Sequence, residues 1–143
     1  MMWTIAEAAT EADRAACLAL RIEVFCGEQG VTREEEIDGL DDGARHLLAT
    51  VAGSPGGTLR LRFQGEAAKV ERVCVAGAHR GTGLGAALMR EALRLAAEAG
   101  ATEARLGAQV AVIPFYERLG FTAHGPEYLD ARIPHRNMTR PLP

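Results

Sequence analysis

The sequence predicts an α/β fold: one domain, residues 1–143, built on a mixed, strongly twisted sheet of six or seven strands with helices on both faces. Three features of the chain lead to this fold class. Residues 69–75 are rich in β-branched valine, which favours a strand. A glycine-rich loop at residues 80–85 follows, and a helix with an apolar stripe begins at once. The length of 143 residues is enough for one hydrophobic core.

The first predicted elements are a strand and a helix. Residues 3–8 predict a weak strand, and residues 11–25 predict an amphipathic helix with Thr10 as its cap. The apolar positions of this helix are Ala15, Leu18, Ile22 and Phe25. Residues 28–42 then carry seven carboxylates, which are Glu28, Glu34, Glu35, Glu36, Asp38, Asp41 and Asp42. An acidic segment of this kind can line a cleft that receives a cationic substrate.

Three consecutive strands are predicted next. Residues 44–52 predict a strand, residues 53–57 a Gly-Ser-Pro-Gly-Gly turn, and residues 58–63 a second strand. Residues 64–67 connect this strand to the central one. Because strands joined by short turns pair as neighbours, these three predict an antiparallel meander.

The central helix and the segments after it continue the alternation of helix and strand. The apolar stripe of this helix consists of Leu84, Leu88, Ala92, Leu95 and Ala96, and Gly100 serves as its C-cap. Residues 103–109 predict a short strand parallel to the central one, because the helix between them forms a crossover connection. Residues 112–119 predict a second crossover helix. Residues 121–128 and 137–140 are the candidate last strands.

The loop at residues 80–85 has the composition of an anion site. The first amides of the following helix have no partner within the helix and point along a favourable dipole. Gly81, Gly83 and Gly85 allow a backbone with φ > 0 and the close approach of a bulky anion. Arg80 adds a guanidinium suited to a phosphate. The loop therefore predicts a bound phosphate or pyrophosphate, and the alternative is a tight strand–helix connection without a ligand.

Two common phosphate-binding motifs fit this loop poorly. A Walker A sequence needs Lys-Ser or Lys-Thr after the glycines, and neither is present. Gly81, Gly83 and Ala86 satisfy the G-x-G-x-x-A pattern of dinucleotide-binding proteins. That pattern also needs an acidic residue at the end of the next strand, whereas Glu103 opens it. A nicotinamide-binding module is therefore kept only as an outside alternative.

Two segments of the chain resemble motifs of one enzyme superfamily. The pattern Arg80-x-x-Gly83-x-Gly85 after a valine-rich strand resembles motif A of the GNAT acyltransferases. Residues 114–121, Pro-Phe-Tyr-Glu-Arg-Leu-Gly-Phe, resemble the Phe-Tyr-Glu-x-x-Gly-Phe segment of that superfamily. Further residues resemble a small bacterial branch typified by the ElaA and YjcF proteins; they are 21–25, 28–29, 36–38, 41, 44–46 and 134–138. The resemblance covers nearly the whole chain.

The resemblance implies an acetyl-CoA-dependent N-acetyltransferase. Such an enzyme moves an acetyl group to a primary amine of a small molecule or a protein by direct attack. A transferase that uses a longer acyl-CoA is one alternative, and a non-catalytic CoA-binding sensor or toxin-neutralising partner on the same fold is another. The acceptor is not readable from one sequence. Relatives are often dimers, so a homodimer is one oligomeric state to test.

The resemblance also implies which residues contact acetyl-CoA. Backbone amides of the loop and the helix start hold the pyrophosphate, and these residues are Arg80, Gly81, Thr82, Gly83, Leu84, Gly85 and Ala86. Backbone groups of Val73, Cys74 and Val75 pair with the pantetheine like one more strand. One of their amides serves as the oxyanion donor at the thioester carbonyl. Phe115 packs beside the cofactor, and Gln109 bonds the pantetheine or the ribose side.

Tyr116 is the predicted catalytic acid. In the family, the tyrosine of Phe-Tyr-Glu lies near the thioester sulfur. A phenol with a pKa of about 10 is protonated at neutral pH and can donate to a developing thiolate with a pKa of about 8.5. The alternative is a core tyrosine whose hydroxyl is satisfied by the protein.

Glu71 on the central strand is the predicted catalytic base, since some acetyltransferases use a glutamate of that strand directly or through water. The alternative is an ion pair with a neighbour such as Arg72 or Lys69. His46 and His135 are further candidates, because an unperturbed imidazole can accept a proton at neutral pH.

The acceptor site is predicted from charge and from the resemblance. Glu28, Asp38 and Asp41 are expected at the mouth of a cleft, where they attract a protonated amine. His46 and His135 match the small-branch pattern and are assigned to the substrate site.

Composition excludes several other classes of function. The net charge of −3 gives no general attraction to nucleic acid or to an anionic membrane. The chain shows neither a membrane span nor a signal peptide, so a cytoplasmic location is expected. Cys17, Cys26 and Cys74 have no metal-ligand spacing, so no metal site is predicted. For Cys74, packing inside an apolar strand is the expectation and a nucleophile is the alternative.

Overall fold

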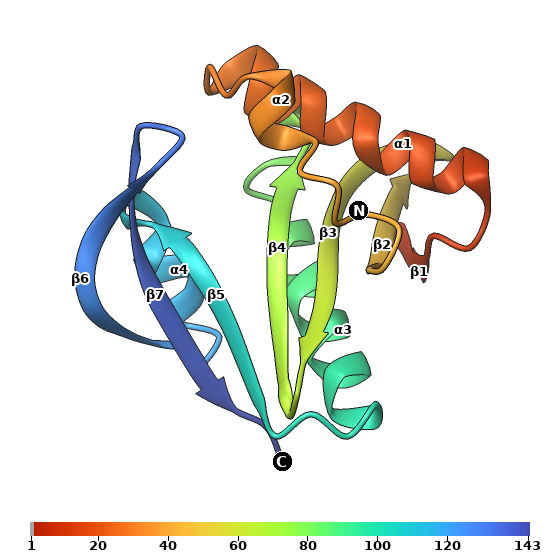
Figure 1. Cartoon of the computed structure of the whole chain (residues 1–143). Coiled ribbons are helices and arrows are strands. Elements are labelled where there is room, and N and C mark those ends of the chain that lie inside the picture. The colour runs from red at the N-terminus through yellow and green to blue at the C-terminus, as the bar shows by residue number, and fades with distance from the viewer. Residues whose placement is uncertain (1) are drawn as a thin grey trace.

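One mixed sheet of seven strands runs through the molecule (Figure 1). In the computed structural model, which describes residues 2–143, the strands are β1 (Trp3–Glu7), β2 (Arg45–Val51), β3 (Ser54–Gln64), β4 (Ala67–Val75), β5 (Glu103–Gln109), β6 (Thr122–Asp130) and β7 (Ile133–Pro141). Their order is β1-β2-β3-β4-β5-β7-β6, in which β4 and β5 are parallel and the other neighbours antiparallel. The predicted α/β class, the meander and the parallel crossover are confirmed.

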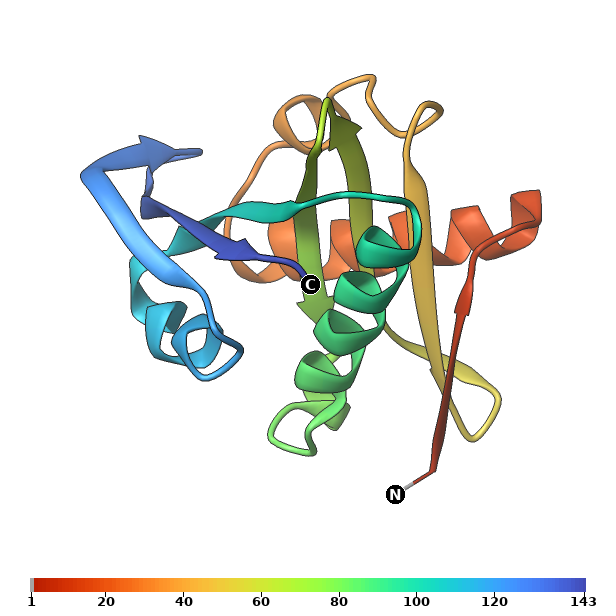
Figure 2. The same cartoon turned by 90° about the horizontal axis from the view of Figure 1, so that it is seen from below.

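Helices cover both faces of this sheet. They are α1 (Glu11–Arg21), α2 (Arg33–Glu36), α3 (Leu84–Glu98) and α4 (Ile113–Glu117). α1 and α3 lie on opposite faces, and α4 lies beside the β5–β7 arm (Figures 1 and 2). The Thr10 hydroxyl caps α1 as predicted by accepting a bond of 3.0 Å from the Asp13 amide. No helix within residues 2–143 is long and apolar enough to cross a membrane.

The helix predicted over residues 11–25 changes its winding partway. After α1 the chain continues as a π-helix, Ile22–Glu28. The turn closes with a bond of 3.2 Å from the Gln29 amide to the Val24 carbonyl, five residues earlier. The wider turn carries the chain out over the sheet as far as Glu28 and Gln29.

α3 builds the main core of the molecule. Its predicted stripe of Leu84, Leu88, Ala92, Leu95 and Ala96 is buried throughout. This stripe packs against the β2 and β3 side chains Leu47, Leu59 and Leu61. A smaller core under α1 contains Cys17, Leu20, Leu48 and Cys74. The two cores hold the strand β4 between two rigid layers.

β3 begins earlier than the sequence predicts. The expected turn at residues 53–57 is shorter, with Ala52 and Gly53 at φ +51° and +80°, and β3 starts at Ser54. A Cβ on Gly57 would lie 2.8 Å from Cδ1 of Leu88. Gly57 therefore marks the close approach of α3 to the sheet, a common reason for glycine inside a strand.

The last two strands are also longer than predicted, because β6 reaches Asp130 and β7 begins at Ile133. Pro134 pairs with Leu129 of β6, beyond the pair Gln109–His135 that ends the contact with β5. Proline is tolerated at this position because β7 is an edge there.

The sheet opens between β4 and β5. The two strands pair only from Ala67–Glu103 to Lys69–Arg105. Beyond these pairs they diverge into the V that Figure 1 shows at the centre of the molecule. Every strand edge inside the V lacks a neighbouring strand, so its backbone groups are available to a ligand.

Candidate active site

A cleft of about 450 Å³ occupies the opening between β4 and β5. One wall consists of β4 from Lys69 to Val75, and the other of β5, β7 and the tip of β6. The segment around Glu28 and Gln29 covers one end. The predicted pantetheine residues Val73, Cys74 and Val75 all line this cleft.

A β-bulge shapes the β4 wall. Thr58 pairs with Cys74 and Arg60 with Glu71, so β4 has one more residue than β3 between these pairs. The β4 residues between these pairs are Arg72 and Val73, and Arg72 has a φ of +56°. A bulge bends its strand and increases the local twist, so it helps to turn β4 away from β5.

The glycine-rich loop leads into α3 at the Val75 end of the cleft. Gly81 and Gly83 have φ values of +76° and +92°, the left-handed conformation that the sequence anticipated. Gly83 caps α3 without a side-chain bond, so the first amides of the helix have no partner from that residue. Thr82 donates its hydroxyl hydrogen to the His79 carbonyl (2.6 Å).

Other residues assigned to this loop contribute in different ways. The Leu84 side chain belongs to the core, so only its backbone is available. Gly85 lies against Phe115 and Val75, where a Cβ would be 3.5 Å and 3.6 Å from their side chains. Phe115 thus packs beside the start of α3, and it is not among the residues that line the cleft.

Arg80 has a carboxylate partner. Its Nη2 donates to Oε1 of Glu28 at 2.6 Å, and its Nε donates to the Val75 carbonyl at 3.0 Å. Both Arg80 and Glu28 line the cleft. Glu28 therefore holds the guanidinium of Arg80, which was predicted to bind phosphate, over the end of β4. A bound phosphate would compete with Glu28 for this guanidinium.

Tyr116 of α4 lines the cleft from the β5 side. Its ring makes edge contacts with Phe115 and Phe121, with centroids 5.0 Å and 6.1 Å apart. Burial raises the pKa of its hydroxyl to about 12, so the phenol is protonated at neutral pH. This hydroxyl makes no hydrogen bond to any group in residues 2–143, which leaves it free to donate into the cleft.

Glu71 also lines the cleft, but its carboxylate is occupied. Oε1 accepts from Nε of Arg62 at 2.6 Å and lies 3.1 Å from Nη2 of Arg60, and Oε2 lies 3.6 Å from Nζ of Lys69. Burial by itself would raise the pKa of Glu71. The hydrogen bond from Arg62 and the charges of Arg60, Arg62 and Lys69 outweigh burial and hold this pKa below its usual range. The ion-pair alternative is therefore realised, with the expected Lys69 and with Arg60 and Arg62, but not with Arg72.

Asp38 and Asp41 were expected at the cleft mouth, and the structure corrects this prediction. Neither lines the cleft. Arg60 is fully buried and donates to both Asp38 oxygens at 2.8 Å and to Asp41 at 2.9 Å. Asp41 also pairs with buried Arg21 at 2.9 Å. These carboxylates neutralise buried arginines and so have little charge left to attract an amine.

His46 is likewise placed away from the cleft. It is buried, its Nε2 lies 2.9 Å from the Asp41 carbonyl, and it is absent from the cleft lining. Its predicted role at the substrate site is corrected to a role in packing the segment that ends at Asp41 against β2.

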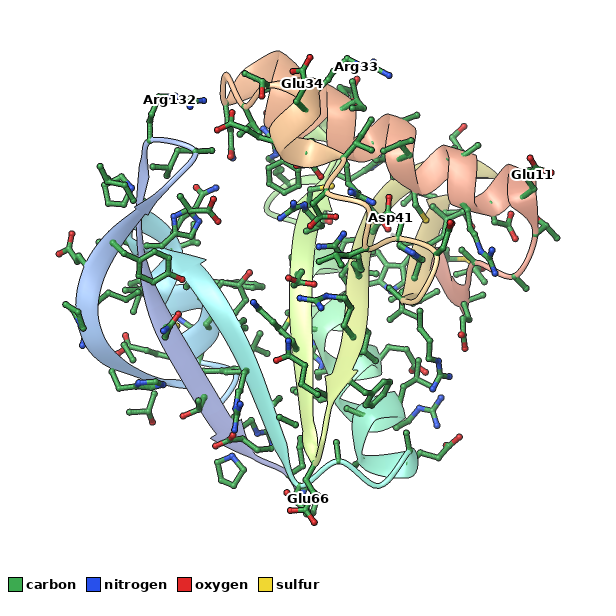
Figure 3. All side chains as sticks on the ribbon, viewed as in Figure 1. Glu11, Arg33, Glu34, Asp41, Glu66 and Arg132 are labelled. Carbon is green, nitrogen blue, oxygen red and sulfur yellow. The ribbon has the colours of Figure 1, made fainter. Side chains whose placement is uncertain are left out.

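Three side-chain bridges join the segment at residues 28–35 to the rest of the cleft. Besides the pair Glu28–Arg80, Nε2 of Gln109 donates to Oε1 of Gln29 at 2.8 Å. Arg132, at the tip of the β6–β7 hairpin, donates to Glu35 at 3.0 and 3.1 Å. Figure 3 labels Arg132 at this tip, facing α2 across the cleft mouth. The acidic segment is thus a cover over the cleft.

The β7 wall holds His135, which was predicted, and Tyr128 and Asn137, which were not. The rings of Tyr128 and His135 stack with centroids 5.8 Å apart, and the Tyr128 hydroxyl donates to Oδ1 of Asn137 at 2.8 Å. The sequence offered little signal for Tyr128, because its position depends on a shift in strand register. The thiol of Cys74 is buried, which raises its pKa to about 12 and disfavours a nucleophilic role.

Comparisons with known proteins agree with this geometry. The family model described as Acetyltransferase (GNAT) domain matches residues 8–142. The uncharacterized N-acetyltransferase YjcF of Bacillus subtilis is 38% identical over 122 residues, which are 85% of this chain and 87% of YjcF. An acyl-CoA N-acyltransferase from Pseudomonas aeruginosa shares 36% identity and a TM-score of 0.86, covering 98% and 99% of the two chains. ElaA of Escherichia coli shares 27% identity and a TM-score of 0.87, covering 97% and 99%.

Proposed function

Because the chain belongs to the GNAT family and is therefore an acyltransferase, we propose that it transfers the acetyl group of acetyl-CoA to a primary amine by direct attack. The observation that carries this proposal is the composition of the cleft. The unpaired edge of β4, the guanidinium of Arg80 in the loop before α3, and the Tyr116 phenol, which has no hydrogen-bond partner within residues 2–143, all line one opening.

Acetyl-CoA is proposed to lie along the opening between β4 and β5. The amides at the start of α3 receive the pyrophosphate, and Arg80 exchanges its bond to Glu28 for one to a phosphate oxygen. The edge of β4 at residues 73–75 receives the pantetheine amides as a neighbouring strand would. A β4 amide serves as the donor for the oxyanion. Gln109, released from Gln29, bonds the pantetheine.

Tyr116 is proposed to act on the leaving sulfur. A phenol with a pKa of about 12 is a weaker acid than a thiol, so complete transfer of its proton to the thiolate is unfavourable on its own. The transfer becomes favourable when the phenol regains a proton from the acylated nitrogen in the same step. Tyr116 therefore acts as a relay between nitrogen and sulfur, while its burial keeps it protonated at rest.

Glu71 is proposed to have a structural role in the wall of the cleft and not to act as the base. Its carboxylate is held by Arg60 and Arg62, and its pKa lies below the usual range. Both effects reduce its ability to accept a proton from an ammonium group. Glu28, which lines the cleft, becomes available to an amine when Arg80 turns to the phosphate.

The test combines a binding measurement with a turnover measurement. Calorimetry with CoA and acetyl-CoA measures affinity, and free thiol is followed with acetyl-CoA and a panel of amino acids, polyamines, alkylamines and peptides. We expect micromolar to millimolar binding and amine-dependent thiol release, with the acetylated product identified by mass spectrometry. A parallel series with longer acyl-CoA donors tests the chain-length alternative. Tight CoA binding without transfer to any amine would instead identify a CoA sensor.

A further inference from the structure

We propose that His135 is the general base of this reaction, that its Nε2 accepts the proton of the incoming ammonium, and that Tyr128 positions its ring. This inference rests on the proposed acetyl transfer. It replaces Glu71 with a residue on the opposite wall of the same cleft.

The backbone around His135 selects the tautomer that a base needs. Nδ1 of His135 lies 2.7 Å from the Ile133 carbonyl, two residues earlier. A carbonyl can only accept, so Nδ1 carries the hydrogen in this contact. In the neutral ring Nε2 is then the acceptor, and no group in residues 2–143 bonds to it.

The stack with Tyr128 fixes the ring plane of His135. The two rings lie 5.8 Å apart with an interplanar angle of 24°. A register shift in β6 between His124 and Tyr128 brings Tyr128 directly opposite His135. Without this bulge a different side chain would face the imidazole.

The neighbouring strand makes room for Tyr128. The Tyr128 hydroxyl crosses over β5 above Gly107, where a Cβ would lie only 2.4 Å from the oxygen. The hydroxyl then reaches Oδ1 of Asn137 at 2.8 Å. The β6 bulge, the stack on Tyr128, the space above Gly107 and the Asn137 amide together hold the His135 imidazole in one orientation at the edge of the cleft. These contacts distinguish His135 from a surface histidine that rotates freely.

The charged groups around His135 favour its use as a base. Its partner on β5 is the uncharged Gln109, its partner on β6 is Tyr128, and Asp130, two residues farther along β6, also lines the cleft. Asp130 forms no ion pair within residues 2–143, so its carboxylate is available to draw an ammonium group to this wall. The covering segment contributes Glu28, Glu35 and Glu36 to the cleft lining, and each of them pairs with an arginine.

The chemical step balances with these residues. The ammonium R–NH₃⁺ gives one proton to Nε2 of His135, and the amine lone pair forms a C–N bond at the carbonyl carbon of the acyl thioester. The displaced electron pair moves to the carbonyl oxygen and then returns, so that the C–S bond breaks and the thiolate leaves. Tyr116 protonates the thiolate and regains a proton from the acylated nitrogen. His135 releases its proton to solvent, so an ammonium and a thioester give an amide, a thiol and one proton.

The kinetic test compares two histidine variants. We expect His135→Gln to lower kcat/KM for the acceptor by roughly 10²- to 10⁴-fold and to remove the acidic limb of its pH profile, while acetyl-CoA affinity stays near the parent value. His124→Gln, on an exposed β6 position outside the cleft, is the matched control and should leave rate and pH profile unchanged. Tyr128→Leu, which removes the stack, should show an intermediate loss.

A second measurement tests the geometry independently of turnover. Long-range ¹H–¹⁵N NMR of the imidazole should find the hydrogen on Nδ1, and an Nε2–H tautomer would overturn the proposal. An active wild-type protein whose His135→Gln variant keeps its rate and acidic limb would also overturn it, while acetyl transfer itself would stand. A wild-type protein that releases no thiol with any amine would overturn both proposals.

Discussion

The two walls of the cleft are both polar, but they use their polar groups differently. The β4 wall, together with β3 and the segment at residues 36–41 that pack behind it, contains most of the charge, in a network of arginines and carboxylates that bond to one another. Its members are Arg21, Glu36, Asp38, Asp41, Arg60, Arg62, Glu71 and Arg72. The opposite wall contains few charges, but the Tyr116 hydroxyl and one nitrogen of His135 have no hydrogen-bond partner among the described residues 2–143.

This difference indicates that side chains with unused hydrogen-bonding groups are a better guide to the candidate catalytic residues than a high density of charge is. A carboxylate that already accepts from two arginines has a lowered pKa and an occupied surface, so it gains little from binding an ammonium. An unbonded phenol or imidazole in a cleft can donate or accept without breaking an existing bond. We therefore expect the charged wall to stabilise the shape of the cleft and the less charged wall to carry out the proposed reaction.

The largest expected effect tests the charged wall, which is expected to stabilise the fold around the cleft. Arg60→Met should lower the free energy of unfolding by about 3–5 kcal/mol, roughly two to four powers of ten in the folding equilibrium, because it leaves Asp38, Asp41 and Glu71 without their shared buried partner. Urea denaturation measures the loss. Arg62→Met is the matched control on the same strand, since Arg62 is partly exposed and pairs only with Glu71. Equal losses in the two variants would show that the network is no more than a surface feature.

The next effect tests the reactive wall. Tyr116→Phe should lower kcat by roughly 10- to 1000-fold with acetyl-CoA affinity near the parent value, because its hydroxyl relays a proton from nitrogen to sulfur only during the reaction. Tyr128→Phe is the control with the same chemical change. It keeps the stack on His135 and loses one hydrogen bond to Asn137, so a loss of at most about tenfold is expected. Full kcat in Tyr116→Phe would make Tyr116 a packing residue.

The same comparison explains how far the sequence could predict the site. The central strand, the glycine loop and α3 are contiguous, so their periodicity and glycines predicted them directly. Arg60 lies between Leu59 and Leu61 and so resembles a solvent-facing strand residue. Asp38 and Asp41 bury it from about twenty residues away, and no local pattern reveals that pairing.

For a similar reason, only some of the proposed catalytic and positioning residues on the less charged wall could be predicted from the sequence. Tyr116 belongs to a sequence motif and was found. Tyr128 faces His135 only because of a register shift within β6, and such shifts follow from three-dimensional packing. His46 and His135 looked alike in sequence, but the structure buries one against Asp41 and places the other at the cleft.

A smaller effect concerns the end of the cleft next to the start of α3, where the pyrophosphate of acetyl-CoA is proposed to bind. Gly83→Val should weaken acetyl-CoA binding at least about tenfold, because a β-branched residue at φ +92° displaces the first amides of α3. Gly100→Val at the other end of α3 is the matched control, since its φ is +93° and the backbone strain is similar. Calorimetry should find reduced affinity only in the first variant. Similar affinities in both would remove the pyrophosphate from the start of α3.

The smallest effect concerns Arg132, the bridge across the cleft mouth that belongs fully to neither wall. Its bond to Glu35 is exposed, so Arg132→Ala should leave kcat unchanged and alter the acceptor KM by less than about fivefold. The pKa of Glu35, held at about 2 mainly by the Arg132 hydrogen bond, should rise in the variant. It should stay below the usual value because the Thr32 backbone amide still donates to this carboxylate in a capping box.

The sign of the pH effect follows from that lowered pKa. The unfolded chain binds a proton at Glu35 more readily than the folded chain, so the bridge contributes stability above the usual carboxyl pKa and loses it as the pH falls toward 2. Wild type and Arg132→Ala should therefore differ most in stability at neutral pH and converge in acid. NMR titration of the Glu35 carboxyl checks the pKa directly. If that pKa does not move in the variant, Arg132 is not its main partner in solution, and the mouth of the cleft is open rather than bridged.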